Sequence, residues 1–206
     1  MTLWLFGDIY TQFNNISNQW MFTVSNILKT DLNSLALHGT ALEFTYQRFN
    51  IARKKIKEND IVIVSLPNFD RRWFFASYPE YAEFDSSPTN NKKENKAISL
   101  FREYLDHKEI HQVYLIDFLY NLYSLTEDLN LHTIIIPDSD DVETFLNEKK
   151  ELFPLFHIPI GKFEDIADKN IDKNLNYLKD ESHTILANKI IDNIKNNTII
   201  NFKEEF

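Results

Sequence analysis

Short apolar runs alternate along the chain with segments whose apolar positions recur every three to four residues. The runs have the length and the β-branched or aromatic composition of buried strands. The clearest is Asp60–Leu66, because nearly continuous β-branched residues suit a strand covered on both faces, as in a parallel sheet. The predicted strands are Thr2–Phe6, Leu35–Leu37, Asp60–Leu66, His111–Phe118 and Leu131–Pro137.

The segments between these runs have the apolar spacing of helices. In Gln19–Leu28, for example, Trp20, Val24 and Ile27 fall on one face. The acidic run Asp138–Asp141 lacks the glycine and the distal glutamate of a calcium-binding EF-hand loop, and it predicts a helix N-terminus instead. The predicted helices are Gln19–Leu28, Ala41–Lys57, Lys96–His107 and Glu181–Asn196, and Pro67–Asn95 is expected to be loop.

Alternation of strands and helices over the whole length is typical of a doubly wound sheet. There is no internal repeat and no linker-like boundary, and 43% of the residues are hydrophobic, which is enough for a packed core. We therefore expect residues 1–206 to form one domain of the α/β class. Its predicted architecture is three-layer α/β/α with a flavodoxin-like parallel sheet.

Composition removes several classes of function. The chain has 22 basic and 31 acidic residues and a net charge of −9, which argues against a nucleic-acid partner. It has no cysteine, so disulfides and thiol chemistry are excluded. No apolar run approaches the ~20 residues that cross a bilayer, and no signal peptide is evident. We expect a soluble protein, cytoplasmic or virion-associated, without a membrane partner.

Ligands of doubly wound sheets bind beyond the carboxyl ends of the strands. Three predicted strand ends combine a small or polar residue with a sharp change of direction. These are Gly7–Tyr10, His38–Thr40 and Pro67–Asp70. The sequence therefore predicts that a binding site lies along this edge of the sheet.

In their order and spacing, these junctions resemble the sequence blocks of the SGNH (GDSL) hydrolase superfamily. The first block of that family is a strand that ends in Gly-Asp-Ser, and the matching run here is Phe6-Gly7-Asp8-Ile9-Tyr10-Thr11. The resemblance implies that the backbone N–H of Gly39 and the side chain of Asn68 form an oxyanion hole. The run Asp70–Phe75 is similar to an aromatic segment of virus- and phage-associated members.

The nucleophile position departs from the family pattern. The serine of the first block is replaced by Ile9, whose side chain has no lone pair with which to attack a carbonyl carbon. Serine-type acyl-enzyme chemistry is therefore excluded at this position.

The family's fourth block, Asp-x-x-His before the last helix, fits this chain in two registers. Asp180 and His183 match it literally. In the second register the same slots hold Asn174 and Tyr177, and His183 becomes a structural helix residue. We favour the second register, in which nucleophile, aspartate and histidine are all lost; the literal one stays open as the alternative.

Further candidates for the pocket are Asp8, His38, Arg71, Arg72 and Trp73. Arginine suits bidentate contacts with anions, and aromatic rings suit sugar faces or partner surfaces. Each has a structural alternative. Asp8 can bond backbone amides, and His38 can simply be packed or solvated. The aromatic rings can fill the core, with Arg71 paired to Asp70 or Glu80. The histidines have no metal-ligand spacing, so neither a metal site nor a cofactor is expected.

These observations favour a degenerate SGNH-hydrolase-like protein that binds rather than cleaves. The expected partner is a glycan or an acylated small molecule, or a protein in a larger assembly. One alternative is an esterase or acetylesterase in which Asp180 and His183 activate water. Another is a virion or assembly subunit without a small ligand.

Overall fold

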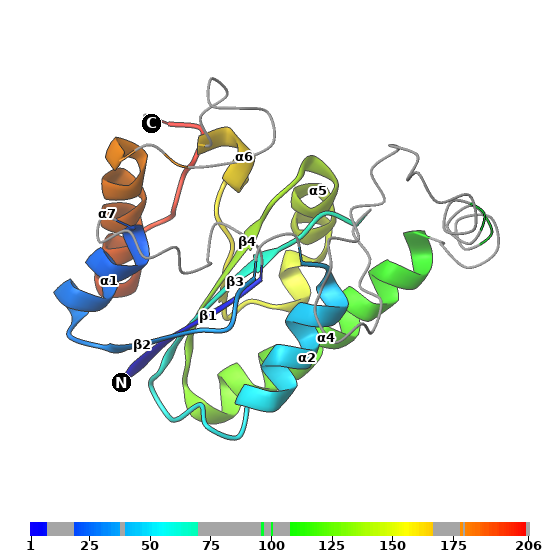
Figure 1. Ribbon diagram of the computed structural model, residues 1–206, viewed down its shortest axis with the longest axis horizontal. Coiled ribbons are helices and arrows are strands. Elements are labelled where there is room, and N and C mark those ends of the chain that lie inside the picture. The colour runs from blue at the N-terminus through cyan, green and yellow to red at the C-terminus, as the bar shows by residue number, and fades with distance from the viewer. Residues whose placement is uncertain are drawn as a thin grey trace.

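The computed structural model describes residues 1–7, 19–37, 40–69, 96, 100, 108–166, 178 and 180–204. At its centre lies a parallel sheet (Figure 1). Its strands are β1 Thr2–Phe6, β2 Asp31–Ser34, β3 Ile61–Leu66, β4 His132–Pro137 and β5 Phe156–His157.

The strand order is β2-β1-β3-β4-β5, with every neighbouring pair parallel. This is the flavodoxin-like order, in which the chain winds outward from β1 in both directions. The topological switch point lies between β1 and β3, where Leu5 pairs with Ile63. The predicted α/β class and flavodoxin-like sheet are confirmed.

Helices cover both faces of the sheet (Figure 1). On one face α1 (Trp20–Leu28) and α7 (Asp180–Asn196) lie side by side. On the other lie α2 (Leu42–Ala52), α4 (Lys108–Leu129) and α5 (Asp140–Lys149). Two short pieces, η2 (Lys150–Leu152) and α6 (Phe163–Ile166), complete the described elements.

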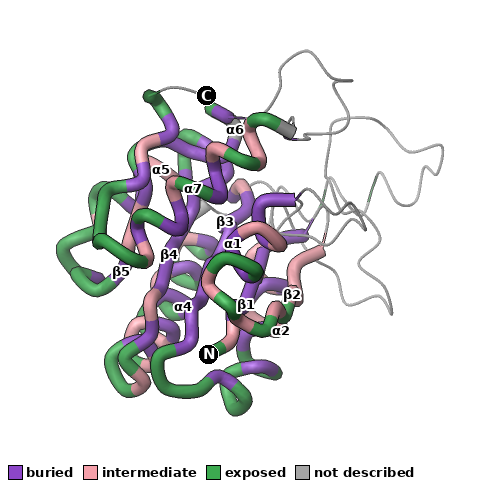
Figure 2. Tube along the Cα trace, turned by 90° about the vertical axis from the view of Figure 1, so that its left-hand side faces the viewer, coloured by how far each residue is buried: buried purple, intermediate pink, exposed green. Residues whose placement is uncertain are grey.

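Successive side chains of each strand point to opposite faces of the sheet, so the core has two halves. Leu3 and Leu5 of β1 pack under α1 and α7, whereas Trp4 and Phe6 point toward α2 and α4. Every residue of β3 is buried, and the central strands form a continuous buried band in Figure 2. This double coverage explains why β3 is a continuous apolar run.

The amino ends of β1 and β3 are joined by one buried carboxylate. Asp60 accepts hydrogen bonds from the backbone N–H of Thr2 (2.7 Å), the indole Nε1–H of Trp4 (2.9 Å) and the backbone N–H of Lys57 (3.0 Å). Three donors satisfy a charge that would be costly to bury alone. Asp60 thereby connects the start of β1 to the residue that precedes β3.

Two predicted strands were wrong or displaced. His111–Phe118 lies within α4, because Leu115, Phe118, Leu119 and Leu122 are buried at helical spacing while Val113 and Tyr114 are exposed. Taken alone, this short apolar run fits the periodicity of a strand as well as that of a helix. Only the apolar positions that follow it identify the helix. In place of Leu35–Leu37, the structure has β2 four residues earlier, in a polar segment. Leu35 and Leu37 still donate backbone bonds to Leu5 and Gly7.

The remaining boundaries differ less. The strand β5 has only two residues and had no sequence signal, and α2 ends at Ala52 rather than Lys57. Lys96 and Leu100 are helical, while the rest of the predicted helix and most of the Pro67–Asn95 loop lie outside the described residues. No helix in the described part of the chain is both long and apolar enough to span a membrane.

Candidate functional site

The carboxyl edge of the sheet begins with an unusually close approach of β1 and β3. Gly7 follows β1 directly and has a φ of +110°, and a Cβ built on it would lie 1.9 Å from the carbonyl oxygen of Ser65 in β3. Only glycine fits both the backbone conformation and the space. The switch point is therefore packed backbone against backbone.

The carbonyl oxygen of Gly7 accepts two hydrogen bonds. It accepts hydrogen bonds from the backbone N–H of Leu37 and from the hydroxyl of the buried Thr40, each at 3.0 Å. The residues on either side of the predicted second block are thus anchored to the end of β1. His38 and Gly39 themselves lie outside the described residues.

Asn68 follows β3 at the same edge. Its neighbours Pro67 and Phe69 are buried, and the Phe69 ring meets Phe145 of α5 edge to face at 5.8 Å. Asn68 itself is half-buried. The structure therefore holds Asn68 between two packed residues at the carboxyl end of a central strand, and its oxyanion role stays a prediction.

A buried serine–aspartate pair links β3 to the end of β4. The Ser65 hydroxyl donates to Asp138 Oδ1 at 2.6 Å, and the backbone N–H of Asp138 donates to the Leu66 carbonyl at 3.0 Å. Both side chains are buried. Sequence reasoning missed this pair; its one signal was a serine near the end of an otherwise apolar strand.

His183 lies in the first turn of α7 and contacts the start of α1. Its Nδ1 accepts a hydrogen bond from the backbone N–H of Trp20 at 3.3 Å. An imidazole nitrogen that accepts carries no proton. In a serine–histidine–aspartate triad the same nitrogen instead donates to the carboxylate. Here His183 acts as a partner for the N-terminus of α1, whose N-cap residue Gln19 makes no side-chain cap bond.

The predicted helix N-terminus at Asp138–Asp141 is confirmed, since α5 begins at Asp140. The Asp140 carboxylate pairs with Lys162 Nζ at 2.8 Å, and this hydrogen bond lowers the pKa of Asp140. Among the described residues, no three histidine or acidic side chains lie close enough together to hold a metal ion.

Most of the other predicted site residues lie where the structure gives no description, so their roles stay predictions. Asp180 begins α7. The residues outside the described ranges are Asp8, Ile9, His38, Gly39, Arg71, Arg72, Trp73, Asn174 and Tyr177.

At the opposite, amino-terminal edge of the sheet, two histidines that are distant in the sequence lie in contact. His132 of β4 and His157 of β5 stack with ring centroids 4.1 Å apart. No local spacing could have shown this, because the contact depends on the pairing of two strands.

Comparison with solved structures places the fold. An esterase, EstA, from Pseudoalteromonas sp. matches with a TM-score of 0.55 and 11% identity, over 94% of this chain and 96% of that one. A G-D-S-L family lipolytic protein from Desulfitobacterium hafniense matches at 0.50 and 14% identity, over 91% and 95%. An acetyl xylan esterase from Butyrivibrio proteoclasticus matches at 0.51 and 13% identity, over 95% of this chain and 64% of that one.

At the level of sequence, the chain matches no protein-family model and no curated protein. The structural similarity covers nearly the whole chain, and the parallel sheet is flavodoxin-like, as the sequence predicted. The protein therefore has the fold of the SGNH/GDSL esterases.

Proposed function

We propose that this protein is a non-catalytic relative of SGNH hydrolases, which keeps a pocket at the carboxyl edge of its sheet but does not cleave esters. The observation that carries the proposal is Ile9, a hydrocarbon side chain at the position that matches the family's serine. Without an oxygen at this position, no acyl-enzyme forms there.

The contacts of His183 support the same proposal. Since Nδ1 accepts from the Trp20 backbone, it holds no proton to donate to a carboxylate. A catalytic imidazole needs that donation to keep its other nitrogen basic and correctly aimed. His183 is better suited to capping the N-terminus of α1 than to activating water.

The ligand class that we propose is a glycan or an acylated small molecule. Asn68 offers an amide at the carboxyl edge, and the hydrogen-bonded pair Ser65 and Asp138 lies buried at the carboxyl ends of β3 and β4. Neighbours of the same fold are named as esterases, one of them an acetyl xylan esterase, and such enzymes bind acyl groups. A protein that lost hydrolysis would still recognise the carbonyl of such a group.

The direct test is an ester-hydrolysis assay on the purified protein with p-nitrophenyl acetate and butyrate. We expect no turnover above the uncatalysed rate. Turnover that His183→Ala abolishes would overturn the proposal and establish the alternative, in which Asp180 and His183 activate water. Fluorophosphonate labelling does not separate these two, because neither forms a serine adduct.

A gain-of-function experiment tests the preferred register. The triple variant Ile9→Ser, Asn174→Asp, Tyr177→His restores a complete triad in that register. Ester hydrolysis by this variant, and not by Ile9→Ser alone, would support both the register and the loss of catalysis. Binding is tested in parallel by titrating the unmodified protein with acetylated xylo-oligosaccharides in a calorimeter.

A further inference from the structure

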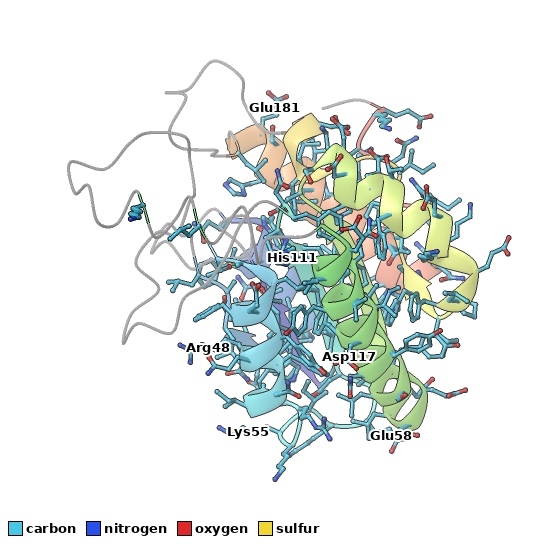
Figure 3. The ribbon with its side chains drawn as sticks, turned by 90° about the vertical axis from the view of Figure 1, so that its right-hand side faces the viewer. Arg48, Lys55, Glu58, His111, Asp117 and Glu181 are labelled. Atoms are coloured by element: carbon cyan, nitrogen blue, oxygen red, sulfur yellow. The ribbon has the colours of Figure 1, made fainter. Side chains whose placement is uncertain are left out.

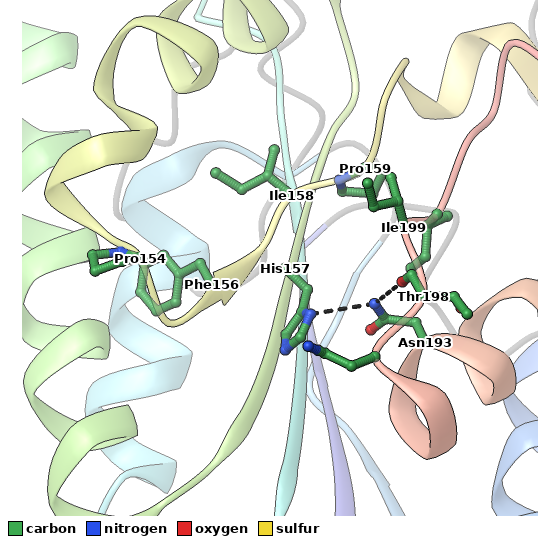
Figure 4. A pocket seen from close by; sticks show the side chains of 10 residues that line it. Pro154, Phe156, His157, Ile158, Pro159, Asn193, Thr198 and Ile199 are labelled. Atoms are coloured by element: carbon green, nitrogen blue, oxygen red, sulfur yellow. Dashed lines mark hydrogen bonds between the residues drawn. The ribbon is translucent and has the colours of Figure 1, made fainter.

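Two stacked histidines and a buried asparagine lie at the amino-terminal edge of the sheet, away from the site proposed above. His132 begins β4 and His157 ends β5, and their rings stack with centroids 4.1 Å apart and 16° between planes. Asn193 of α7 is 2% exposed and bonds to both rings. Figure 4 shows Asn193 between His157 and Thr198.

The hydrogen bonds of Asn193 fix the tautomer of both rings. The Thr198 carbonyl can only accept, so the atom that faces it is the amide Nδ2. The same Nδ2 faces His157 Nδ1 at 3.2 Å, which must therefore accept and carries no proton. The amide oxygen is left for His132 Nε2 at 2.9 Å, which must donate.

The second nitrogen of each ring then has a defined role, because a neutral imidazole carries one proton. His157 holds its proton on Nε2, which is a donor, and His132 Nδ1 has a lone pair and is an acceptor. Both atoms point away from Asn193, since the two nitrogens of an imidazole face opposite ways. No group in the described part of the chain bonds to either atom, and both are accessible to solvent. The stacked rings thus offer one donor and one acceptor to a ligand.

Burial keeps both rings neutral. Burial, and secondarily the neighbouring His132, lowers the pKa of His157 to about 4. Burial also lowers the pKa of His132, against an opposing effect of its bond to Asn193. Near pH 7 the rings therefore hold the tautomers that Asn193 sets, and titratable groups desolvated in this way are typical of binding sites.

Both rings line a hollow of about 620 Å³ at the amino ends of the central strands. This volume lies within the range of small-molecule sites. The hollow is also lined by the buried Ile61 and Leu131 and by the exposed Leu155. Apolar walls with a few fixed polar groups are the usual composition of a ligand site.

A second polar pair lines the same hollow. Asn59 and Asn130 are both exposed, both have a positive φ, and their amides bond to each other at 2.8 Å. Whichever amide donates, the pair keeps one donor and one acceptor that no described residue uses. The pattern of the histidines is therefore repeated at the rim.

The charge of the hollow selects against ions. Glu127 is the one ionised side chain among the described residues that line it, so an anion would be repelled. For a metal ion, the described residues provide no group of three histidine or acidic side chains. His157 Nε2 also holds a proton where a metal would need a lone pair. The ligand that fits is uncharged.

A hydroxyl group matches this pattern, because it donates and accepts at once. One hydroxyl can donate to His132 Nδ1 and accept from His157 Nε2–H, while others meet the asparagine pair and the Glu127 carboxylate. The C–H face of a sugar ring suits the exposed Leu155. We propose that this hollow is a second binding site, in which the stacked histidines bind a hydroxyl of an uncharged sugar. The site does not depend on the function of the carboxyl edge.

NMR titration of the ¹⁵N-labelled protein at pH 7 with xylotriose, cellotriose and maltotriose tests the site. The free protein should carry a proton on His157 Nε2 and none on Nδ1. At least one trisaccharide should shift the ring signals of His132 and His157, and leave the amides of Gly7 and Asn68 unchanged. Trigalacturonate should not bind, because Glu127 repels its carboxylates.

Variants of exposed residues in the hollow provide matched comparisons. Asn130→Gly removes an amide but tolerates the positive φ, and should weaken binding about fivefold. Its control is Asn197→Gly, since Asn197 is also exposed with a φ of +57° but does not line this hollow. Glu127→Ala should weaken binding to a similar extent. Glu58→Ala should not, because Glu58 is exposed at the same end of the molecule but outside the hollow (Figure 3).

His132→Phe keeps a stacked ring but removes the acceptor, and should weaken binding about tenfold. If this variant does not fold, Asn130→Gly and Glu127→Ala decide the outcome, and full affinity in both overturns the proposal. It is also overturned if none of the three trisaccharides shifts the rings, or if trigalacturonate binds as well as they do. Shifts confined to Gly7 and Asn68 would overturn this site and leave the proposed function of the carboxyl edge intact.

Discussion

The backbone N–H of Trp20 donates a hydrogen bond to Nδ1 of His183, which joins the first turn of α1 to the first turn of α7. The two helices cover one face of the sheet, and this bond aligns their starts. It also leaves the imidazole in the tautomer opposite to that of a catalytic triad. One contact thus bears both on stability and on the proposed loss of hydrolysis.

Replacing His183 with alanine should lower the free energy of unfolding by about 1 kcal/mol, as the loss of a helix-end partner does. Urea denaturation measures this difference. Glu181→Ala, an exposed change in the same turn, is the control and should be nearly neutral. Equal stability of His183→Ala and the unmodified protein would contradict the structural role.

Gly7→Ala should destabilise the protein by about 2–4 kcal/mol, because it adds a Cβ against the Ser65 carbonyl and strains a positive φ. Gly161→Ala is the matched comparison. Gly161 has a φ of +93°, but its nearest obstacle is the Asp165 carboxylate at 2.8 Å, which can move. Thermal denaturation should therefore rank Gly7→Ala as clearly worse; the reverse order would disprove the close packing of β1 and β3.

Asp60→Ala should cost about 3 kcal/mol or more, since three donors at the amino ends of β1 and β3 lose a charged acceptor. The exposed Asp31 at the start of β2 provides the control, and Asp31→Ala should change stability little. Chemical denaturation of both variants gives the comparison. A loss as small as that of Asp31→Ala would show that Asp60 does not hold the two strands together.

Stability should fall as the pH is lowered from 7 to 4.5. The folded state lowers the pKa of His157 to about 4 from 6.5, so between these values the unfolded chain binds more protons. The stabilisation that comes from keeping His157 neutral is complete above pH 6.5 and is lost toward pH 4. By pH 4.5 the loss amounts to about 2–3 kcal/mol. His132, whose pKa is also lowered, acts in the same direction.

The pH effect of His157 is isolated by comparison with His157→Asn. The carboxylates titrate in both proteins, so only the difference between their two stability curves reports on the ring. Urea titrations at several pH values should show the unmodified protein losing more stability in acid than the variant. Parallel curves would mean that His157 is not held neutral by the fold.

Much of the fold could be predicted from periodicity. The strands β1, β3 and β4 are buried on both faces, so their sequences are nearly continuous apolar runs. The prediction failed where packing decides the structure. The apolar run in α4 is ambiguous over a few residues, and β5 exists only because Phe156 and His157 pair with β4.

In the candidate site, too, local sequence signals could be predicted and contacts between distant residues could not. Gly7 and Asn68 stand next to strong strand signals, so their place at the carboxyl edge followed from topology. The partners of His183 and Asp138 could not be predicted, because these bonds join residues distant in sequence. A serine within an apolar strand was visible, but nothing local identified Asp138 as the group that it meets.

Asn193 satisfies three partners with one short amide, and this has an evolutionary consequence. Aspartate would remove the donor and leucine both polar atoms, while glutamine would carry the amide one bond too far from the helix. Homologues too diverged to align over their full length should therefore still keep an asparagine in the last helix whenever they keep both rings, which provides a marker for finding them.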